Sequence, residues 1–317
     1  KDLENFLKNQ RNNVLRISGN DRFETAFNFA TFSTQDPKYK NQNVNLEPFE
    51  KIFSTNVCPI FVNGLNFVDA FSAAPWGANE NSAIYLTPSN TLPDIITENI
   101  DVFKNILFYF RIAGGIKAVS KEVEDQLKAK GLTVNRISGN DRYETALNVA
   151  KEAVDKGVLK TEKIFLCSGI SPADALSIAS VAAKEEGIIL LTDGNTLTEE
   201  AKKYIKMGVE VKIIGGTSVI SDKLEQELKS MKATVERISG NDRYETSVKV
   251  YEKYYKPMGV KTIYLANGLT MADALTGAGV AYNFGTGLLL TSANEMIPSM
   301  KEIIKEMKIL RILGGNA

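Results

Sequence analysis

One eleven-residue motif, which occurs three times, constrains the fold of this chain more than any other feature. It reads Arg-Ile-Ser-Gly-Asn-Asp-Arg-Phe-Glu-Thr-Ala at Arg16–Ala26 and returns, with Tyr for Phe, at Arg136–Ala146 and Arg237–Ser247. Repetition of this fidelity indicates an array of one structural unit. We therefore expect three modules, the third truncated at its C-terminal end, over residues 1–130, 131–232 and 233–317.

Within the motif, the order of residues predicts a strand, a tight turn and the start of a helix. Val14–Ile17 is apolar enough for a strand, and Gly19-Asn20 is typical of a turn. Asp21 and Glu24 have the spacing of a capping box, in which both side chains accept hydrogen bonds from backbone N–H groups at the helix start. Apolar residues then follow on one helical face, at Phe23, Ala26, Phe27 and Ala30.

Three further landmarks recur in each copy and extend this pattern to a whole unit. A second helix start carries Asp69, Asp174 or Asp273, and a strand ends in Leu-Thr, with its Thr 18 residues after that Asp. A later strand ends in Gly-Gly. Strands such as Gly187–Leu191 are continuous apolar runs, which is typical of parallel strands covered on both faces. The expected fold class is α/β, with three tandem modules of parallel sheets flanked by helices.

Composition excludes several classes of function. Lys plus Arg and Asp plus Glu each total 38, so the chain lacks the excess of positive charge that a nucleic acid partner requires. The sequence contains no His, which removes His-based catalysis and most catalytic zinc sites. No apolar run is long enough to span a bilayer. We predict no metal ion, no cofactor, no nucleic acid partner and no membrane span.

Arginine is concentrated in the repeated motif, which holds six of the nine arginines in the chain. One arginine in each copy stands in the first helical turn, where the helix dipole disfavours a cation: Arg22, Arg142 and Arg243. These side chains either pair with a motif carboxylate such as Asp21 or Glu24, or hold an anionic group of a ligand beside the helix N-terminus. Both alternatives stay open. Ligands of parallel α/β sheets bind beyond the carboxyl ends of the strands, where all the landmarks fall.

Other polar landmark residues are candidate ligand contacts at the same sheet edge. They are Ser18, Ser138, Ser239, Asn20, Asn140, Asn241, Asp69, Asp174 and Asp273. The three aspartates fit helix capping better than catalysis, because they stand in the first turn of a helix. The serines lack a Gly-x-Ser-x-Gly elbow and a His partner, so we expect no catalytic nucleophile.

A second motif arginine, at Arg16, Arg136 and Arg237, shares a strand face with the motif serine. A buried central strand rarely tolerates such a face, so we expect an edge strand or a module interface where these arginines pair with carboxylates. These strands directly follow the helices that link consecutive copies. We therefore predict that the modules bury the polar strands against one another in a closed triangle, with the third module touching the first.

The triplicated motif, the Ala-Asp-Ala-Leu helix starts at 173–176 and 272–275 and the Gly-Gly strand ends closely resemble the cell-wall-binding repeat type 2 modules. Clostridial surface-layer and cell-wall proteins carry these modules in sets of three. The resemblance implies a Toprim-like, Rossmann-like module, a pseudo-threefold trio and non-covalent anchoring to an anionic polysaccharide. The first copy departs from the pattern at Asn66-Phe67-Val68-Asp69, and it has insertions around Thr34–Pro48 and near Thr55–Phe61 that we expect to be surface loops.

Three classes of function are consistent with these features. The favoured one is a non-enzymatic, secreted protein of the Gram-positive cell wall or surface layer that binds an anionic wall polysaccharide, with other surface-layer proteins as candidate partners. The rival is an enzyme with a Toprim-like or nucleotide-binding site, and the third is a lattice protein without a ligand. Recurrence of the polar landmarks in every copy favours binding, because an enzyme built from duplicated modules usually keeps one specialised site.

Overall fold

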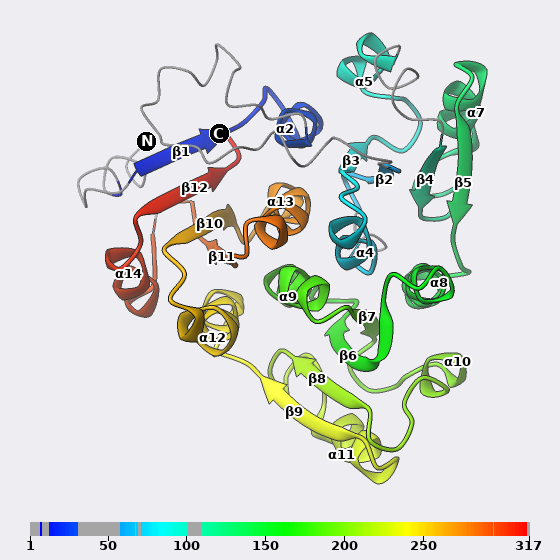
Figure 1. Ribbon diagram of the computed structural model, residues 1–317. Coiled ribbons are helices and arrows are strands. Elements are labelled where there is room, and N and C mark those ends of the chain that lie inside the picture. Colours follow the sequence, from blue (N-terminus) through cyan, green and yellow to red (C-terminus); the bar gives the residue numbers. More distant parts are fainter. Residues whose placement is uncertain are drawn as a thin grey trace.

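The computed structural model describes residues 7, 13–30, 58–66, 68, 71–100, 109–293 and 295–315. They form three four-stranded sheets around a common centre (Figure 1). All strand pairings recorded in the three sheets are parallel. The predicted α/β class, with three modules of parallel sheets flanked by helices, is therefore confirmed. Within the described ranges, no helix has the length and apolar character needed to cross a membrane.

The second sheet shows the plan of all three. Its strand order is β7-β6-β8-β9, so the last strand in sequence lies at an edge. Strand β7 is buried along its whole length, as its continuous apolar sequence predicted. The elements of this unit are α8 (Arg142–Asp155), β6 (Lys160–Ser168), α9 (Ala173–Lys184), β7 (Gly187–Thr192), α10 (Glu199–Lys202), β8 (Glu210–Ile214), α11 (Asp222–Ser230) and β9 (Thr234–Ile238).

The first sheet repeats this order as β3-β2-β4-β5. Its elements are α2 (Arg22–Ala30), β2 (Ile60–Asn63), α4 (Ala73–Asn79), β3 (Ile84–Thr87), α5 (Asp94–Glu98), β4 (Tyr109–Ala113), α7 (Lys121–Ala129) and β5 (Thr133–Ile137). The insertion around Thr34–Pro48 lies outside the described residues. The surface loop expected near Thr55–Phe61 is wrong at its described end, because Ile60 and Phe61 are buried in β2, between β3 and β4.

The third sheet has the order β1-β12-β10-β11 and joins the two ends of the described chain. Strand β1 (Asn13–Ile17) pairs with β12 (Ile309–Leu313) along its whole length. The direct contact predicted between the third and first modules is confirmed by this pairing. The other elements of the unit are α12 (Arg243–Tyr254), the 3-10 helix η3 (Lys256–Met258), β10 (Thr262–Asn267), α13 (Ala272–Asn283), β11 (Leu288–Thr291) and α14 (Pro298–Lys305).

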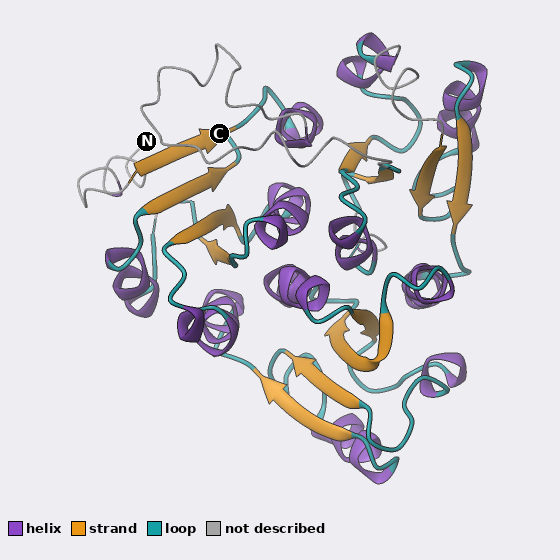
Figure 2. Ribbon diagram, viewed as in Figure 1, coloured by secondary structure: helices purple, strands orange, loops and turns teal. Residues whose placement is uncertain are grey.

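Each sheet is completed by an edge strand that the next copy of the repeat supplies. The edge strands are β5, β9 and β1, and each carries the Arg-Ile-Ser start of a motif. Sheets and sequence repeats are therefore offset, and the expected module boundaries after residues 130 and 232 stay a prediction. Figure 2 shows the sheets around a group of central helices, with further helices at the periphery. The predicted burial of the polar strands against one another is wrong, because they lie at three separate sheet edges.

The strand arginines connect these edges to the neighbouring strand ends. Arg16, Arg136 and Arg237 donate hydrogen bonds from Nη1 to the carbonyls of Gly314, Gly114 and Gly215, at 2.6, 2.8 and 2.8 Å. Arg136 and Arg237 also make the expected contacts with carboxylates. Their Nε atoms donate to Glu124 and Glu225, respectively, each at 2.8 Å.

The centre of the ring is a bundle of three alanine-rich helices, α4, α9 and α13, one from each unit, which contact one another. A single amide joins them. Asn79 of α4 donates from Nδ2 to the carbonyl of Ala183 at 2.9 Å, and its Oδ1 accepts from the Tyr282 hydroxyl at 3.1 Å. Because Ala183 belongs to α9 and Tyr282 to α13, one side chain connects all three modules.

Replacing Asn79 with Ala should lower the free energy of unfolding by about 1–3 kcal/mol, because the partners in two other modules lose their hydrogen bonds. Asn99→Ala is the matched control. Asn99 donates to the carbonyl of Ile95 within its own segment, and Asn79 makes the same kind of local bond to the carbonyl of Pro75. Urea unfolding followed by circular dichroism measures both variants. Equal losses in the two would contradict a joining role for Asn79.

Candidate functional site

The repeated motif builds the same capped helix start in all three copies. Oδ1 of the N-cap aspartate accepts the N–H of the glutamate three residues later at 2.8 Å in each case, for Asp21, Asp141 and Asp242. That glutamate accepts the N–H of the preceding asparagine in turn, at 2.7, 2.7 and 2.8 Å for Asn20, Asn140 and Asn241. The capping box is confirmed, although the glutamate bonds to the residue before the N-cap. Protein carboxylates thus already occupy N–H groups at these helix starts, which leaves anion binding to the arginine side chains.

The motif glycine and threonine fix the turn before the helix. A Cβ added to Gly19, Gly139 or Gly240 would lie 2.5, 2.5 or 2.4 Å from the Cβ of the capping glutamate, so the turn requires glycine. The glycine N–H donates to the motif threonine hydroxyl, at 2.8, 2.9 and 3.1 Å for Thr25, Thr145 and Thr246. Sequence analysis missed this threonine, although its presence in every copy was a usable signal.

The arginines of the first helical turn bond to backbone carbonyls, and not to the motif carboxylates that were one of the two alternatives. Nη1 of Arg22, Arg142 and Arg243 donates to the carbonyls of Gly64, Gly169 and Gly268 at 2.8, 2.6 and 2.8 Å. The neighbouring aromatic ring packs on the same glycine, and Phe23 would lie 2.7 Å from a Cβ at Gly64. The arginines therefore have a structural partner while their side chains stay partly exposed.

Asp174 is a buried carboxyl and Asp273 a partly buried one, and both lie at seams between copies. Burial raises the pKa of Asp174 to about 6, while the Thr246 hydroxyl and Arg243 of the next copy act to lower it. Burial also raises the pKa of Asp273, and Arg22 of the first copy acts in the opposite direction. These two seams thus bring an aspartate of one copy close to the arginine of the next.

The capping role expected for these two aspartates is wrong. Oδ2 of Asp174 would lie 2.7 Å from a Cβ added to Gly215, and Oδ2 of Asp273 2.5 Å from one added to Gly314. Both glycines have left-handed backbones, with φ of 120° and 105°, so the bend of the strand end leaves room for the carboxyl group. The side chains face the Gly-Gly turns and not the N–H groups of their own helices. Asp69 lies outside the described residues.

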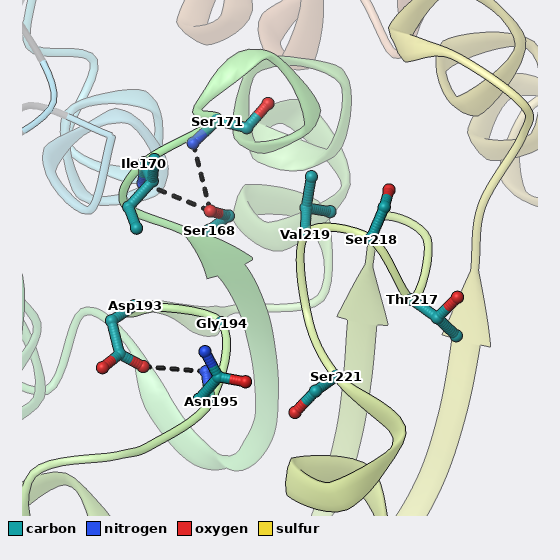
Figure 3. Close-up of a pocket in the computed structure, with 10 residues that line it drawn as sticks. All are labelled: Ser168, Ile170, Ser171, Asp193, Gly194, Asn195, Thr217, Ser218, Val219 and Ser221. Carbon is teal, nitrogen blue, oxygen red and sulfur yellow. Dashed lines mark hydrogen bonds between the residues drawn. The ribbon is translucent and has the colours of Figure 1, made fainter.

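Two clefts open at the carboxyl ends of the sheets, where ligand sites were expected. One of about 210 Å³ is shared by the first and third copies and is lined by Asn20, Arg22, Asp273 and Gly314 among others. The other, of about 140 Å³, lies at the second sheet (Figure 3) and is lined by Ser168, Ile170, Ser171, Asp193, Gly194, Asn195, Thr217, Ser218, Val219 and Ser221. The first cleft brings predicted contact residues of two copies together.

The motif serines are placed differently from the arginines and asparagines. Ser18 and Ser138 accept hydrogen bonds with their backbone carbonyls, from Asn28 and Asn148 at 3.0 and 2.9 Å, and Ser239 is partly exposed. Neither of the two clefts is lined by a motif serine. Among the described residues, no three Cys, Asp or Glu side chains gather as a metal site would require.

Fused α/β repeats that each lend an edge strand to a neighbouring sheet define a closed ring of repeats. A model of the family described as Cell wall binding domain 2 matches the chain three times, over residues 16–124, 136–225 and 237–317. The chain belongs to this family of cell-wall-binding domains. The cleft shared by the first and third copies therefore lies between two matched repeats.

Known relatives agree with this assignment and place the chain among secreted, cell-wall-associated proteins. It is 29% identical to the N-acetylmuramoyl-L-alanine amidase LytC of Bacillus subtilis, covering 96% of this chain and 56% of the amidase. It is 30% identical to the amidase enhancer of the same organism, covering 92% of this chain and 36% of that protein. The solved structure of Cwp8 from Clostridium difficile matches with a TM-score of 0.80 and 30% identity, over 96% of this chain and 49% of Cwp8. The chain thus spans about half or less of each relative.

Replacing Asp174 with Asn should remove a dependence of stability on pH. Because the folded pKa of about 6 exceeds the ordinary value of 3.8, the folded protein holds this proton more tightly than the unfolded chain. This stabilisation is present at low pH and is lost as the pH rises through about 6. The stability of the wild type relative to the variant should therefore fall by roughly 2–3 kcal/mol between pH 4 and pH 7.

Urea unfolding at several pH values measures this difference. The exposed Asp155→Asn variant serves as the control for removal of one carboxylate. A difference between wild type and the Asp174 variant that does not change with pH would show that the carboxyl is not held in a raised-pKa environment.

Proposed function

We propose that the chain anchors a longer secreted protein, without catalysis, to an anionic polysaccharide of a Gram-positive cell wall. The observation that carries this proposal is the cleft shared by the first and third copies, in which Arg22 stands beside Asp273 and Gly314 at the carboxyl ends of the strands. The motif that supplies Arg22 recurs as Arg142 and Arg243, each with the same glycine contact. The expected ligand contacts are these arginines with the motif asparagines and, at the floor of the seam, the aspartates.

Arginine suits this role because of the shape and charge of its guanidinium group. The bond from Arg22 to Gly64 uses Nη1, while a guanidinium carries five N–H donors in a rigid fork that matches phosphate and carboxylate. The glycine carbonyl holds the group in place, which lowers the entropy lost on binding. Since the chain has no net charge, attraction to an anionic polymer depends on these local cations.

Three arginines in the same structural setting on one ring would act together on a repeating polymer. Each weak contact raises the effective concentration of the polymer at the next arginine, so the avidity exceeds the affinity of any single contact. An enzyme of Toprim-like or nucleotide-binding type would need an accessible acidic group at its site. Asp174 is instead buried and packed against Gly215, which favours binding over catalysis at that seam. Contact with other surface-layer proteins stays a prediction.

Sedimentation with purified Gram-positive walls tests the proposal. The chain should co-sediment with intact walls and should lose most of this binding once the anionic polysaccharide has been extracted from them. Added salt should weaken the binding, because exposed charge contacts are screened. Equal binding to extracted and intact walls, or turnover of wall polymer by the chain, would overturn the proposal.

Replacing Arg22, Arg142 and Arg243 together with Ala should reduce wall retention at least about tenfold, because a hydrogen bond to a charged group is worth roughly 1.5–3 kcal/mol. The corresponding Lys variant should recover only part of the binding, since Lys lacks the planar fork. A control with the same loss of charge replaces Lys130, Lys160 and Lys305 with Ala. These lysines lie at the first residue of a strand or a few residues before one, and therefore near the amino ends of the strands.

Thermal melts of the three variants separate binding from folding, because the arginines also hold glycine carbonyls. Normal retention of the Ala variant would assign these arginines a structural role alone. The expected result is that the Arg→Ala variant is folded and fails to bind, while the control variant at Lys130, Lys160 and Lys305 binds normally.

A further inference from the structure

Six large apolar side chains are exposed in the described part of the chain, and three of them occupy one equivalent position. Leu65, Ile170 and Leu269 are exposed by 63%, 68% and 63%. Each directly follows the glycine whose carbonyl accepts the arginine hydrogen bond. A single exposed aliphatic residue is ordinary. The same position in three diverged copies indicates a shared role.

Hydrogen bonds from two successive backbone N–H groups to one side chain hold the turn that carries these residues. The N–H groups of Leu65, Ile170 and Leu269 donate to the side chains of Asn63, Ser168 and Asn267, at 2.7, 3.2 and 2.8 Å. The N–H of the following residue bonds to the same side chain in every copy. Turn positions usually carry polar residues. Each copy instead holds an aliphatic group in solvent on a rigid support.

The surroundings of two of these aliphatic groups are polar and belong to clefts. Ile170 lines the cleft of the second sheet together with Ser171, Asp193, Asn195 and Ser218 (Figure 3). Asn267 and Thr270, on either side of Leu269, line the cleft shared by the third and first copies, which also holds Arg22. An aliphatic group therefore accompanies hydroxyl and amide groups at Ile170 and lies next to a cleft that contains a guanidinium at Leu269.

We infer that Leu65, Ile170 and Leu269 contact the apolar side of a sugar in the wall polymer, namely the C–H face of a ring or the methyl of an acetamido group. The inference rests on the proposed anchoring function and identifies the chemistry of its ligand. A sugar presents hydroxyls to polar groups and C–H groups to an aliphatic side chain at once. A chain of phosphates alone would gain nothing from such a contact, and a protein partner requires a larger apolar core.

The test compares wall retention of a triple variant, L65S/I170S/L269S, with wild type and with M207S/M258S. Met207 and Met258 are exposed by 76% and 49%. They precede strands β8 and β10, and therefore lie near the amino ends of the strands. They are therefore a control for loss of exposed apolar surface. A Leu or Ile side chain buries several methylene equivalents, each worth about fourfold in affinity, so the triple variant should be retained at least about tenfold less. L65I/I170L/L269I should bind as wild type.

The outcomes separate this inference from the anchoring function. If wild type is retained and the triple serine variant, folded by its melt, is retained equally, the aliphatic contact is wrong while anchoring stands. If wild type is not retained, the anchoring function itself fails. If the methionine control loses as much binding, the effect is non-specific adhesion, which overturns the inference. Walls from which the N-acetyl groups have been removed distinguish the two sources of contact. They should retain less wild-type protein only if the acetamido methyl is the group bound.

Discussion

The parallel pairing of β1 with β12 is the interaction on which the rest of this structure depends. It supplies the third sheet with its edge strand, brings Arg16 to the carbonyl of Gly314 and sets Arg22 beside Asp273. The same relation between consecutive copies gives β5 to the first sheet and β9 to the second. Each strand arginine also holds the Gly-Gly turn of the preceding copy. At the seam between the third and first copies, the same pairing brings together the residues that line a cleft.

The polar residues of the motif have different structural roles, which depend on their positions. Asp21 and Glu24 satisfy the backbone of the helix start, and Thr25 satisfies the turn before it. Arg22 bridges to Gly64 of the following sheet, whereas Asp174 and Asp273 fill the space beside left-handed glycines. The arginine is the partly exposed cation among these groups. The same short motif thus supplies both the structural contacts and the residues proposed to bind ligand.

Local features of the fold were predictable from the sequence, and non-local ones were predictable only in outline. The capping box at Asp21 and Glu24 involves neighbours in sequence, so residue spacing was enough to predict it. The edge position of the strand carrying Arg136 followed from its polar face, and the ring closure followed from the repeat order. The packing at the centre was missed, because periodicity does not show which faces meet. Alanine-rich α9 and α13, apolar on all sides, were the available signal for central helices.

The candidate site was predictable in part for the same reason. Sequence placed Arg22, Asn20 and Asp273 at strand ends, but the assignment of Asp174 and Asp273 to helix caps failed. Whether a carboxyl faces its own helix or a neighbouring glycine depends on the φ of Gly215 and Gly314, which no local pattern encodes. Leu65, Ile170 and Leu269 likewise recur visibly in the sequence, yet their exposure could be known only from the fold.

Shared edge strands have a consequence for how such a chain can change over generations. A single repeat excised from the ring would lack the edge strand that the next copy supplies to its sheet. The neighbouring sheet that it had completed would keep only three strands. A fourth repeat inserted between β12 and β1 would have to open a pairing that already closes the circle. Gain or loss of one copy therefore carries a folding penalty that gain or loss of the whole trio does not. Variation is therefore expected within copies instead of in their number.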